Sequence, residues 1–261
     1  MKREDNQNVW DNLWEGKNVS FLQELKGKRN YSKNQYMKEF LEKIKLDPHY
    51  KFIEKELTVS KNAIFLEAGC GTGHWVFYAK EKGNRAFGID ISTEALKIAK
   101  THEKSDSQFI CGDVKKLPIA QGSFDIIVSL GVIEHIDRPD KIINEFYRVL
   151  KKGGKCFITV PNALSTHPIT SLLSKMIGKW DLGREDIYSQ RRLKTLMGSA
   201  GFEDVKTGIV PTGHMLGSFP LYIPLIGRKI FNFLYRISYM IECKQSKLGF
   251  FCFAIGEKMK H

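Results

Sequence analysis

A glycine-rich turn follows an apolar segment in the first third of the chain. The segment Ile64–Ala68 runs directly into Gly69-Cys-Gly-Thr-Gly73, and a helical pattern starts at His74. Glycine adopts backbone angles that other residues avoid, and it lets a ligand approach the main chain closely. Free amides at the start of the following helix favour a carboxylate or another anionic group. Glycine-rich turns after strands are common, so the ligand must be identified from other residues.

Two carboxylates narrow the choice of ligand. Asp90 ends the segment Phe87-Gly-Ile-Asp90, about 20 residues beyond the glycines, where a carboxylate can accept both hydroxyls of a ribose. Asp113 follows the next apolar segment and is placed to accept from an adenine amino group. Each residue alone could equally cap a helix or face solvent. Together with the glycines, at one edge of a predicted sheet, they indicate a nucleoside site.

The residues around the turn favour one kind of nucleoside cofactor. A dinucleotide site needs a third glycine at position 74, which is His74 here. Glu67, just before the turn, would place a negative charge near any pyrophosphate. A positively charged amino-acid end suits this carboxylate better. We therefore expect S-adenosylmethionine, which carries an ammonium and a sulfonium, with NAD as the minor alternative.

The elements that position these residues alternate between strands and helices. Apolar runs at Ala63–Ala68, Ala86–Ile89, Gln108–Ile110, Phe124–Leu130 and Lys155–Val160 enclose amphipathic stretches at His74–Lys82, Thr93–Thr101 and Pro139–Leu150. This pattern predicts βαβ units, a parallel sheet with helices on both faces, and a ligand at the carboxyl ends of the strands. A linker-like stretch after Asn162, a helix at Ser189–Ala200 and strands at Phe202–Val210 and Gly249–Ile255 complete the prediction.

The sequence resembles the class I S-adenosylmethionine-dependent methyltransferases, nearest to the ubiquinone/menaquinone-biosynthesis-like (type 11) small-molecule branch. The resemblance covers residues 60–162 and, more loosely, residues 185–258. The motifs that carry it are Leu66-Glu-Ala-Gly-Cys-Gly-Thr-Gly73, Gly88-Ile-Asp90, Gly112-Asp113, Leu117-Pro-x6-Phe124-Asp125-x-Ile-Val-Ser129, Ile133-Glu-His135-Ile-x-x-Pro139 and Arg148-Val-Leu-Lys-x-Gly-Gly154. It implies a Rossmann-like α/β fold with a seven-stranded, mostly parallel sheet whose last two strands form an antiparallel pair.

The resemblance also implies roles for individual residues. Glu67 is expected to position the methionine end of the cofactor, and Asp90 and Asp113 the ribose and the adenine. Leu130 is expected near the sulfonium. The remaining residues expected at the cofactor are Gly69, Cys70, Gly71, Gly73, Ile91 and Val114.

Two residues after the fourth predicted strand are candidates for the chemistry on the acceptor. His135 is the candidate base, with Glu134 beside it; a histidine that caps the next helix or lines the cofactor pocket is an equally good interpretation. Some relatives bind a divalent metal through Glu-x-x-Glu-His on this loop. Gly131 stands at the first of those positions, so we expect no metal.

The chain carries additions at both ends of this domain. Residues 1–55 are expected to form a helical cap with the aromatic residues Trp10, Trp14, Phe21, Tyr31, Tyr36 and Phe40, and residues 56–261 the cofactor-binding domain. An insertion at 214–247 contains the apolar segment 219–241, in which Arg228, Asn232 and Arg236 form one polar stripe. We interpret this segment as a helix in the membrane interface, a lid over an apolar pocket, or a dimer contact. The first two favour a hydrophobic or lipid-linked acceptor, methylated on oxygen or carbon.

Composition sets the remaining expectations. The net charge is +12, but the lysines are dispersed and no basic stripe or amino-methylating Asn-Pro-Pro-Tyr-type motif is present, so we do not expect a nucleic-acid partner. Five dispersed cysteines and a polar N-terminus predict a cytoplasmic protein without disulfides, peripheral on the inner face of the membrane if 219–241 binds there. Alternative functions are methylation of RNA or protein, and non-catalytic cofactor binding with membrane docking.

Overall fold

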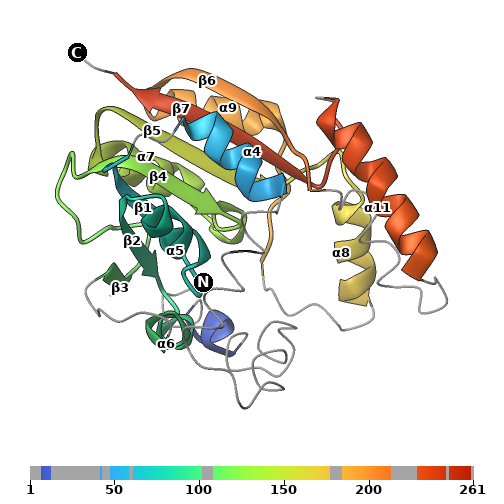
Figure 1. The fold of residues 1–261 in the computed structure, drawn as a ribbon, viewed down its shortest axis with the longest axis horizontal. Helices are drawn as coiled ribbons and strands as arrows, with labels where there is room; N and C mark the ends of the chain where they lie inside the picture. Colours follow the sequence, from blue (N-terminus) through green and yellow to red (C-terminus); the bar gives the residue numbers. More distant parts are fainter. Residues whose placement is uncertain are drawn as a thin grey trace.

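The computed structural model of the chain describes residues 7–12, 42, 48–58, 61–101, 108–176, 184–212, 228–244 and 247–259. Their centre is a seven-stranded sheet of order β3-β2-β1-β4-β5-β7-β6 (Figure 1). The strands are β1 (Ile64–Ala68), β2 (Arg85–Asp90), β3 (Phe109–Cys111), β4 (Phe124–Leu130), β5 (Leu150–Pro161), β6 (Phe202–Val210) and β7 (Phe251–Lys258). The first five are parallel, and β7 runs antiparallel to both β5 and β6.

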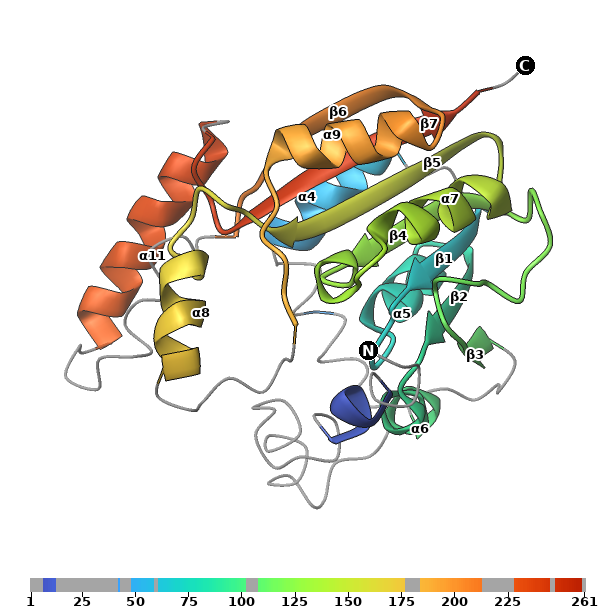
Figure 2. The same cartoon turned by 180° about the vertical axis from the view of Figure 1, so that it is seen from behind.

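Helices cover both faces of this sheet. One face carries α4 (Pro48–Leu57), α5 (His74–Glu81) and α6 (Thr93–Thr101), and the other carries α7 (Pro139–Val149) and α9 (Gln190–Ser199) (Figures 1 and 2). Successive side chains of a strand point to opposite faces, so Phe65 packs in the first layer and Leu66 in the second. The central strands are apolar throughout because both of their faces are buried.

The strand order creates the place where a ligand can bind. The chain runs outward from β1 through β2 to β3 and then returns to form β4 on the other side of β1. The loops after β1 and β4 therefore diverge at the carboxyl edge of the sheet, which leaves a crevice between them. The predicted strands and helices of residues 61–162 are confirmed to within one residue at their ends, except that β5 begins at Leu150 and not at Lys155.

The expected linker after Asn162 is wrong in part, because it contains α8 (His167–Met176). Pro168 occupies the first turn of this helix, where proline's missing N–H costs nothing. Ser165 supports the start, since its hydroxyl accepts a hydrogen bond from the backbone N–H of His167 at 3.1 Å. The sequence Ser-Thr-His-Pro is thus a helix start inside the expected linker.

The insertion between β6 and β7 contains α11 (Arg228–Cys243), which lies next to α8 beyond one end of the sheet (Figures 1 and 2). A buried carboxylate holds it there: Glu242 accepts hydrogen bonds from the backbone N–H groups of Thr212 (2.6 Å) and Phe250 (3.4 Å). Within the described residues, no helix combines the length and apolar character that crossing a membrane requires. Residues 219–227 and the side chains of Arg228 and Asn232 lie outside the described part, so two members of the expected polar stripe are not placed.

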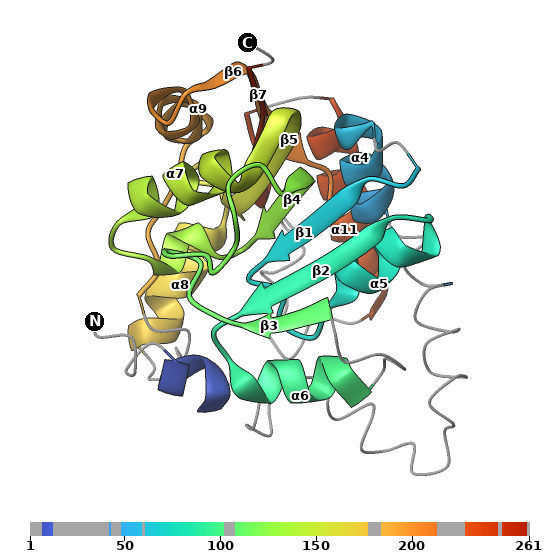
Figure 3. The ribbon, with the colours of Figure 1, turned by 90° about the vertical axis from the view of Figure 1, so that its left-hand side faces the viewer.

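Two parts of the expected N-terminal cap are described. A short helix at residues 7–12 lies next to α6 (Figure 3). The expected boundary at residue 55 falls inside α4, whose Ile53 and Leu57 are buried in the same core cluster as Phe65 of β1. The aromatic residues Trp14, Phe21, Tyr31, Tyr36 and Phe40 lie outside the described residues.

Candidate functional site

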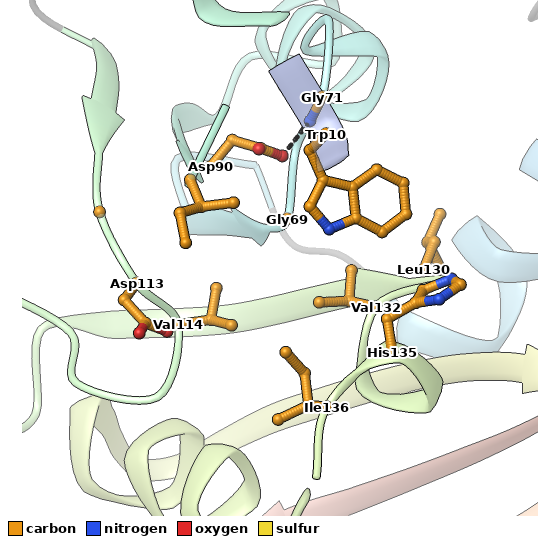
Figure 4. Close-up of a pocket in the computed structure, with 13 residues that line it drawn as sticks. Trp10, Gly69, Gly71, Asp90, Asp113, Val114, Leu130, Val132, His135 and Ile136 are labelled. Carbon is orange, nitrogen blue, oxygen red and sulfur yellow. Dashed lines mark hydrogen bonds between the residues drawn. The ribbon is translucent and has the colours of Figure 1, made fainter. Parts of the chain in front are cut away.

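A cavity of about 180 Å³ opens at the carboxyl edge of the sheet (Figure 4). It is lined by the loop after β1, the ends of β2 and β4, the segment after β3, and the helix at 7–12. Eight of the twelve predicted site residues line it: Gly69, Gly71, Asp90, Ile91, Asp113, Val114, Leu130 and His135. The other lining residues are Trp10, Gly112, Gly131, Val132 and Ile136.

The glycine turn and Asp90 form one hydrogen-bonded unit. The backbone N–H of Gly71 donates to Asp90 Oδ2 at 2.7 Å (Figure 4), and that of Ser92 donates to Oδ1 at 2.8 Å. Burial raises the pKa of the Asp90 carboxyl, although these backbone donors oppose the shift. Gly69 has a φ of +76°, and a Cβ there would lie 2.3 Å from Val132 Cγ2. The turn therefore holds Asp90 at the cavity, and Gly69 and Gly71 line the cavity without side chains.

Three predicted residues lie behind the turn and not on the cavity wall. Glu67 is buried and accepts a hydrogen bond from the backbone N–H of Val76 in α5 at 3.2 Å. Burial, and secondarily the charge of Asp90, raises the pKa of Glu67 well above its ordinary value. Cys70 is also buried, and Gly73 caps α5 with a φ of +80°. Glu67 fixes the start of α5 in this arrangement.

The helix at residues 7–12 closes the cavity from the opposite side. Asp11 accepts hydrogen bonds from the Ser92 hydroxyl (2.6 Å) and from the backbone N–H of Glu94 (3.2 Å), at the start of α6. Burial acts to raise the pKa of Asp11, but these hydrogen bonds outweigh it and lower the pKa. The same helix places Trp10 with its ring edge-on to His135, at 4.9 Å between ring centroids (Figure 4).

The candidate catalytic residues occupy a single 3-10 turn, η2 (Ile133–His135), after β4. The His135 ring lines the cavity, and its Nδ1 lies 2.7 Å from the carbonyl oxygen of Arg184. Burial lowers the pKa of His135, so the ring is neutral at neutral pH. Glu134 lies behind it, with Oε1 4.0 Å from His135 Nε2. Burial raises the pKa of Glu134 to about 8.

Besides Gly112, Gly131, Val132 and Ile136, which lie within two residues of predicted residues in the chain, three residues from distant segments were not among the predicted site residues. Trp10 was expected only as part of an aromatic cap, and its position over the cavity depends on Asp11. Neither residue belongs to a motif that the sequence displays. Glu185 lies within 4.8 Å of the ligand atoms of Glu134 and His135, and it is 50 residues away in the chain. Contacts of this sequence separation leave no local pattern that could have revealed them.

The structure has the class I methyltransferase fold. Five parallel strands are followed in the sheet by the antiparallel strand β7 and then by β6, a glycine turn follows β1, and an acidic residue ends β2. The family model for the methyltransferase domain matches residues 66–158. These residues therefore match a methyltransferase domain. Phosphoethanolamine N-methyltransferase 2 of Haemonchus contortus, solved in complex with S-adenosyl-L-methionine, superimposes with a TM-score of 0.57 at 18% identity, covering 89% of this chain and 59% of the other.

Curated relatives agree with this assignment. The malonyl-[acyl-carrier protein] O-methyltransferase of Hamiltonella defensa is 38% identical over 95 residues, which are 36% of each protein. The ubiquinone biosynthesis O-methyltransferase of Coxiella burnetii is 30% identical over 115 residues, 43% of this chain and 49% of the relative. The matched regions thus span between about a third and a half of the length of these relatives.

Solved structures share the fold over most of the chain. An S-adenosylmethionine-dependent methyltransferase from Thermotoga maritima superimposes with a TM-score of 0.57 at 21% identity, covering 86% of this chain and 95% of the other. Geranyl diphosphate C-methyltransferase from Streptomyces coelicolor gives 0.57 at 14% identity, covering 80% and 78%. Identities at this level establish the common architecture and leave the acceptor open.

Proposed function

We propose that this protein transfers a methyl group from S-adenosylmethionine to a small, hydrophobic or lipid-linked acceptor, on oxygen or carbon. The observation that carries the proposal is the cavity at the carboxyl edge of the sheet, where Asp90, Asp113 and the glycines Gly69 and Gly71 come together. In this proposal Asp90 binds the ribose and Asp113 lies at the adenine. Glu67 acts through the start of α5, on which the methionine end would rest.

Methyl transfer from a sulfonium places modest demands on the enzyme. The electrophile is already activated, so the chain must align the acceptor and exclude water. Leu130, Val132 and Ile136 give the cavity an apolar wall, and Trp10 covers it. Where an acceptor must lose a proton, His135 is the candidate base, because its ring lines the cavity; Glu134 lies behind it.

Exposed apolar side chains on α8 and α11 support a hydrophobic acceptor. Leu172 and Met176 of α8 are 59% and 75% exposed, and Phe233 and Met240 of α11 are 62% and 60% exposed. Arg236 shares this exposed face of α11, while Ser238 and Glu242 are buried against the domain. Apolar side chains beside a cation suit contact with an anionic membrane surface, which we propose for the insertion and which would bring a lipid-linked acceptor to the cavity.

The experiment is a transfer assay with cofactor labelled on its transferable methyl group. The protein is incubated with a lysate, which is then separated into lipid, aqueous, RNA and protein fractions, with Asp90→Ala as the blank. Label in the organic phase supports the proposal. Label in RNA or protein would favour the alternative acceptors, and intact cofactor affinity without label in any fraction would favour a non-catalytic binding protein.

A further inference from the structure

A buried cluster of metal-ligating side chains lies at the rim of the cavity. Glu134, His135 and Glu185 each place one ligand atom within 4.8 Å of the other two. We propose that this cluster is a divalent-cation site. Its role in methyl transfer rests on the proposed function, whereas its occupancy by a cation does not.

The spacing of the atoms suits a shared ion. His135 Nε2 and Glu134 Oε1 are 4.0 Å apart, too far for a hydrogen bond. An ion bound at about 2.0–2.2 Å from each ligand would place two such atoms between about 3 and 4.2 Å apart. All three ligand atoms lie within 4.8 Å of one another, so the widest separation would have to contract by up to about 0.6 Å to reach the upper end of this range.

The ligand atoms are already oriented by neighbouring groups. A carbonyl oxygen only accepts hydrogen bonds, so the contact between His135 Nδ1 and the Arg184 carbonyl at 2.7 Å requires the proton on Nδ1. Nε2 then carries a free lone pair on the side of Glu134. Glu185 Oε2 is in turn 2.7 Å from His167 Nε2. Metal-binding histidines and carboxylates are held by outer partners of these kinds.

One carboxylate oxygen in the cluster lacks a partner within the described part of the chain. The side chains of Glu134 and Glu185 are 2% and 6% exposed, and Glu134 Oε2 has no hydrogen-bond partner among the described residues. Across the described ranges, no lysine or arginine lies within salt-bridge distance of either carboxylate. Burying a carboxylate without a cationic partner is costly. A divalent cation would give Glu134 the partner that it lacks among the described residues.

This site differs from the metal motif expected from the sequence. The expectation of no metal rested on Gly131, which replaces a carboxylate on the loop after β4. Glu185 supplies a third ligand from a distant segment, and of the three ligands His135 lines the cavity. A Cβ at Gly131 would stand 3.5 Å from Glu134 Oε1, so this carboxylate lies directly behind the cavity wall.

The donor set indicates the class of ion and what it would do. Two carboxylates and one imidazole suit Mn²⁺, Fe²⁺ or Zn²⁺. A cation here could bind an acceptor oxygen beside the sulfonium and lower the pKa of an acceptor hydroxyl. His135 Nε2 cannot bind the cation and accept a proton at the same time, so cation binding would replace the direct role of His135 as a base.

Titration of the chelator-stripped full chain with Mn²⁺ tests the site, with free Mn²⁺ measured by electron paramagnetic resonance. We expect one ion per chain, at least tenfold weaker binding in Glu185→Gln, and roughly tenfold weaker binding in His167→Ala through lost orientation. Glu203→Gln, an exposed carboxylate on β6, should bind as the wild type does. Urea unfolding shows whether each variant is folded, and His135→Gln replaces Glu185→Gln if the latter fails to fold.

Two results would overturn the proposal: no binding up to about 1 mM Mn²⁺, or equal affinity in the wild type and in the folded Glu185 or His135 variants. If methyl transfer proceeds undiminished in the presence of chelator, the proposed function stands and the role of the cation in methyl transfer is wrong. If the chain binds the cation but transfers no methyl group, the cation site stands and the proposed function is wrong. The failures of the two proposals are therefore distinguishable.

Discussion

At the scale of single residues, the glycine turn is fixed by two separate requirements. Gly69 needs a left-handed backbone, and it also faces Val132 so closely that no side chain fits. Gly83, at the end of α5, has a similar φ of +85°, but a Cβ there would meet nothing within 4 Å. A comparison of substitutions at Gly69 and Gly83 therefore separates the cost of backbone strain from the cost of steric overlap.

We predict that Gly83→Ala lowers the free energy of unfolding by about 1 kcal/mol, the cost of a side chain in the left-handed region. Gly69→Ala should cost roughly 1–3 kcal/mol more because its Cβ overlaps Val132. Urea unfolding measures both. Adding Val132→Ala to Gly69→Ala should recover part of the loss, and equal costs for the two single variants would contradict the steric argument.

The raised pKa of Glu67 predicts that the free energy of unfolding depends on pH. Its pKa in the folded protein is raised above the ordinary 4.5 by burial and by Asp90, so the folded state holds this proton more tightly than the unfolded chain does. The stabilisation is therefore full below pH 4.5 and is lost as the pH rises through the raised value. Between about pH 5 and about pH 8, the free energy of unfolding should fall more in the wild type than in Glu67→Gln. Parallel pH profiles would contradict this assignment.

At the scale of elements, a small contact decides whether the cavity is covered. The hydrogen bonds of Asp11 attach the helix at 7–12 to the start of α6, and the position of Trp10 next to His135 depends on this attachment. The helix adds little to the core of the domain. Its attachment should therefore affect cofactor binding more than stability.

We predict that Asp11→Ala weakens the affinity for S-adenosylhomocysteine several-fold while changing the free energy of unfolding by less than about 1 kcal/mol, as for a partly exposed hydrogen bond. Titration calorimetry and urea unfolding give the two quantities. Gln7→Ala is the matched control, because its hydrogen bond to Asp11 is long at 3.5 Å. Unchanged affinity in Asp11→Ala would show that the position of Trp10 does not depend on the hydrogen bonds of Asp11.

The exposed face of α11 makes the membrane proposal testable. Replacing both Phe233 and Met240 by serine removes large apolar side chains that are mostly exposed, so the fold should be retained. We expect the variant to lose most of its co-sedimentation with anionic liposomes. Leu248→Ser, another exposed apolar residue outside the helix, should retain it. Full retention by the double variant would leave the lid or dimer interpretation of the insertion.

At the scale of the whole molecule, the cofactor edge joins segments that are distant in sequence. The cavity draws residues from positions 10 to 136, so a ligand there bridges the short N-terminal helix and four strands. A ligand that binds only the folded state stabilises it in proportion to the logarithm of its concentration.

S-adenosylhomocysteine at a hundredfold excess over its Kd should therefore add about 2.7 kcal/mol to the free energy of unfolding. For a domain of this size the midpoint of thermal unfolding should rise by roughly 5–10 °C. Differential scanning calorimetry measures the shift, and Asp90→Ala should abolish it. Asp140→Ala, whose side chain pairs with Arg138 at the surface, should show the full shift.

Much of this molecule follows from its sequence because local patterns determine it. Continuous apolar runs mark strands buried on both faces, and the glycine turn with Asp90 and Asp113 marks the carboxyl edge of the sheet, since parallel strands end on the same side. The start of α8 is also encoded locally, at Pro168, although the pattern around it resembles a linker. Tertiary structure alone decided the rest. Trp10 reaches the cavity only because Asp11 finds the start of α6, and Glu185 joins Glu134 and His135 only because the chain folds back beside η2. These contacts depend on the packing of distant segments, which no local pattern in the sequence encodes.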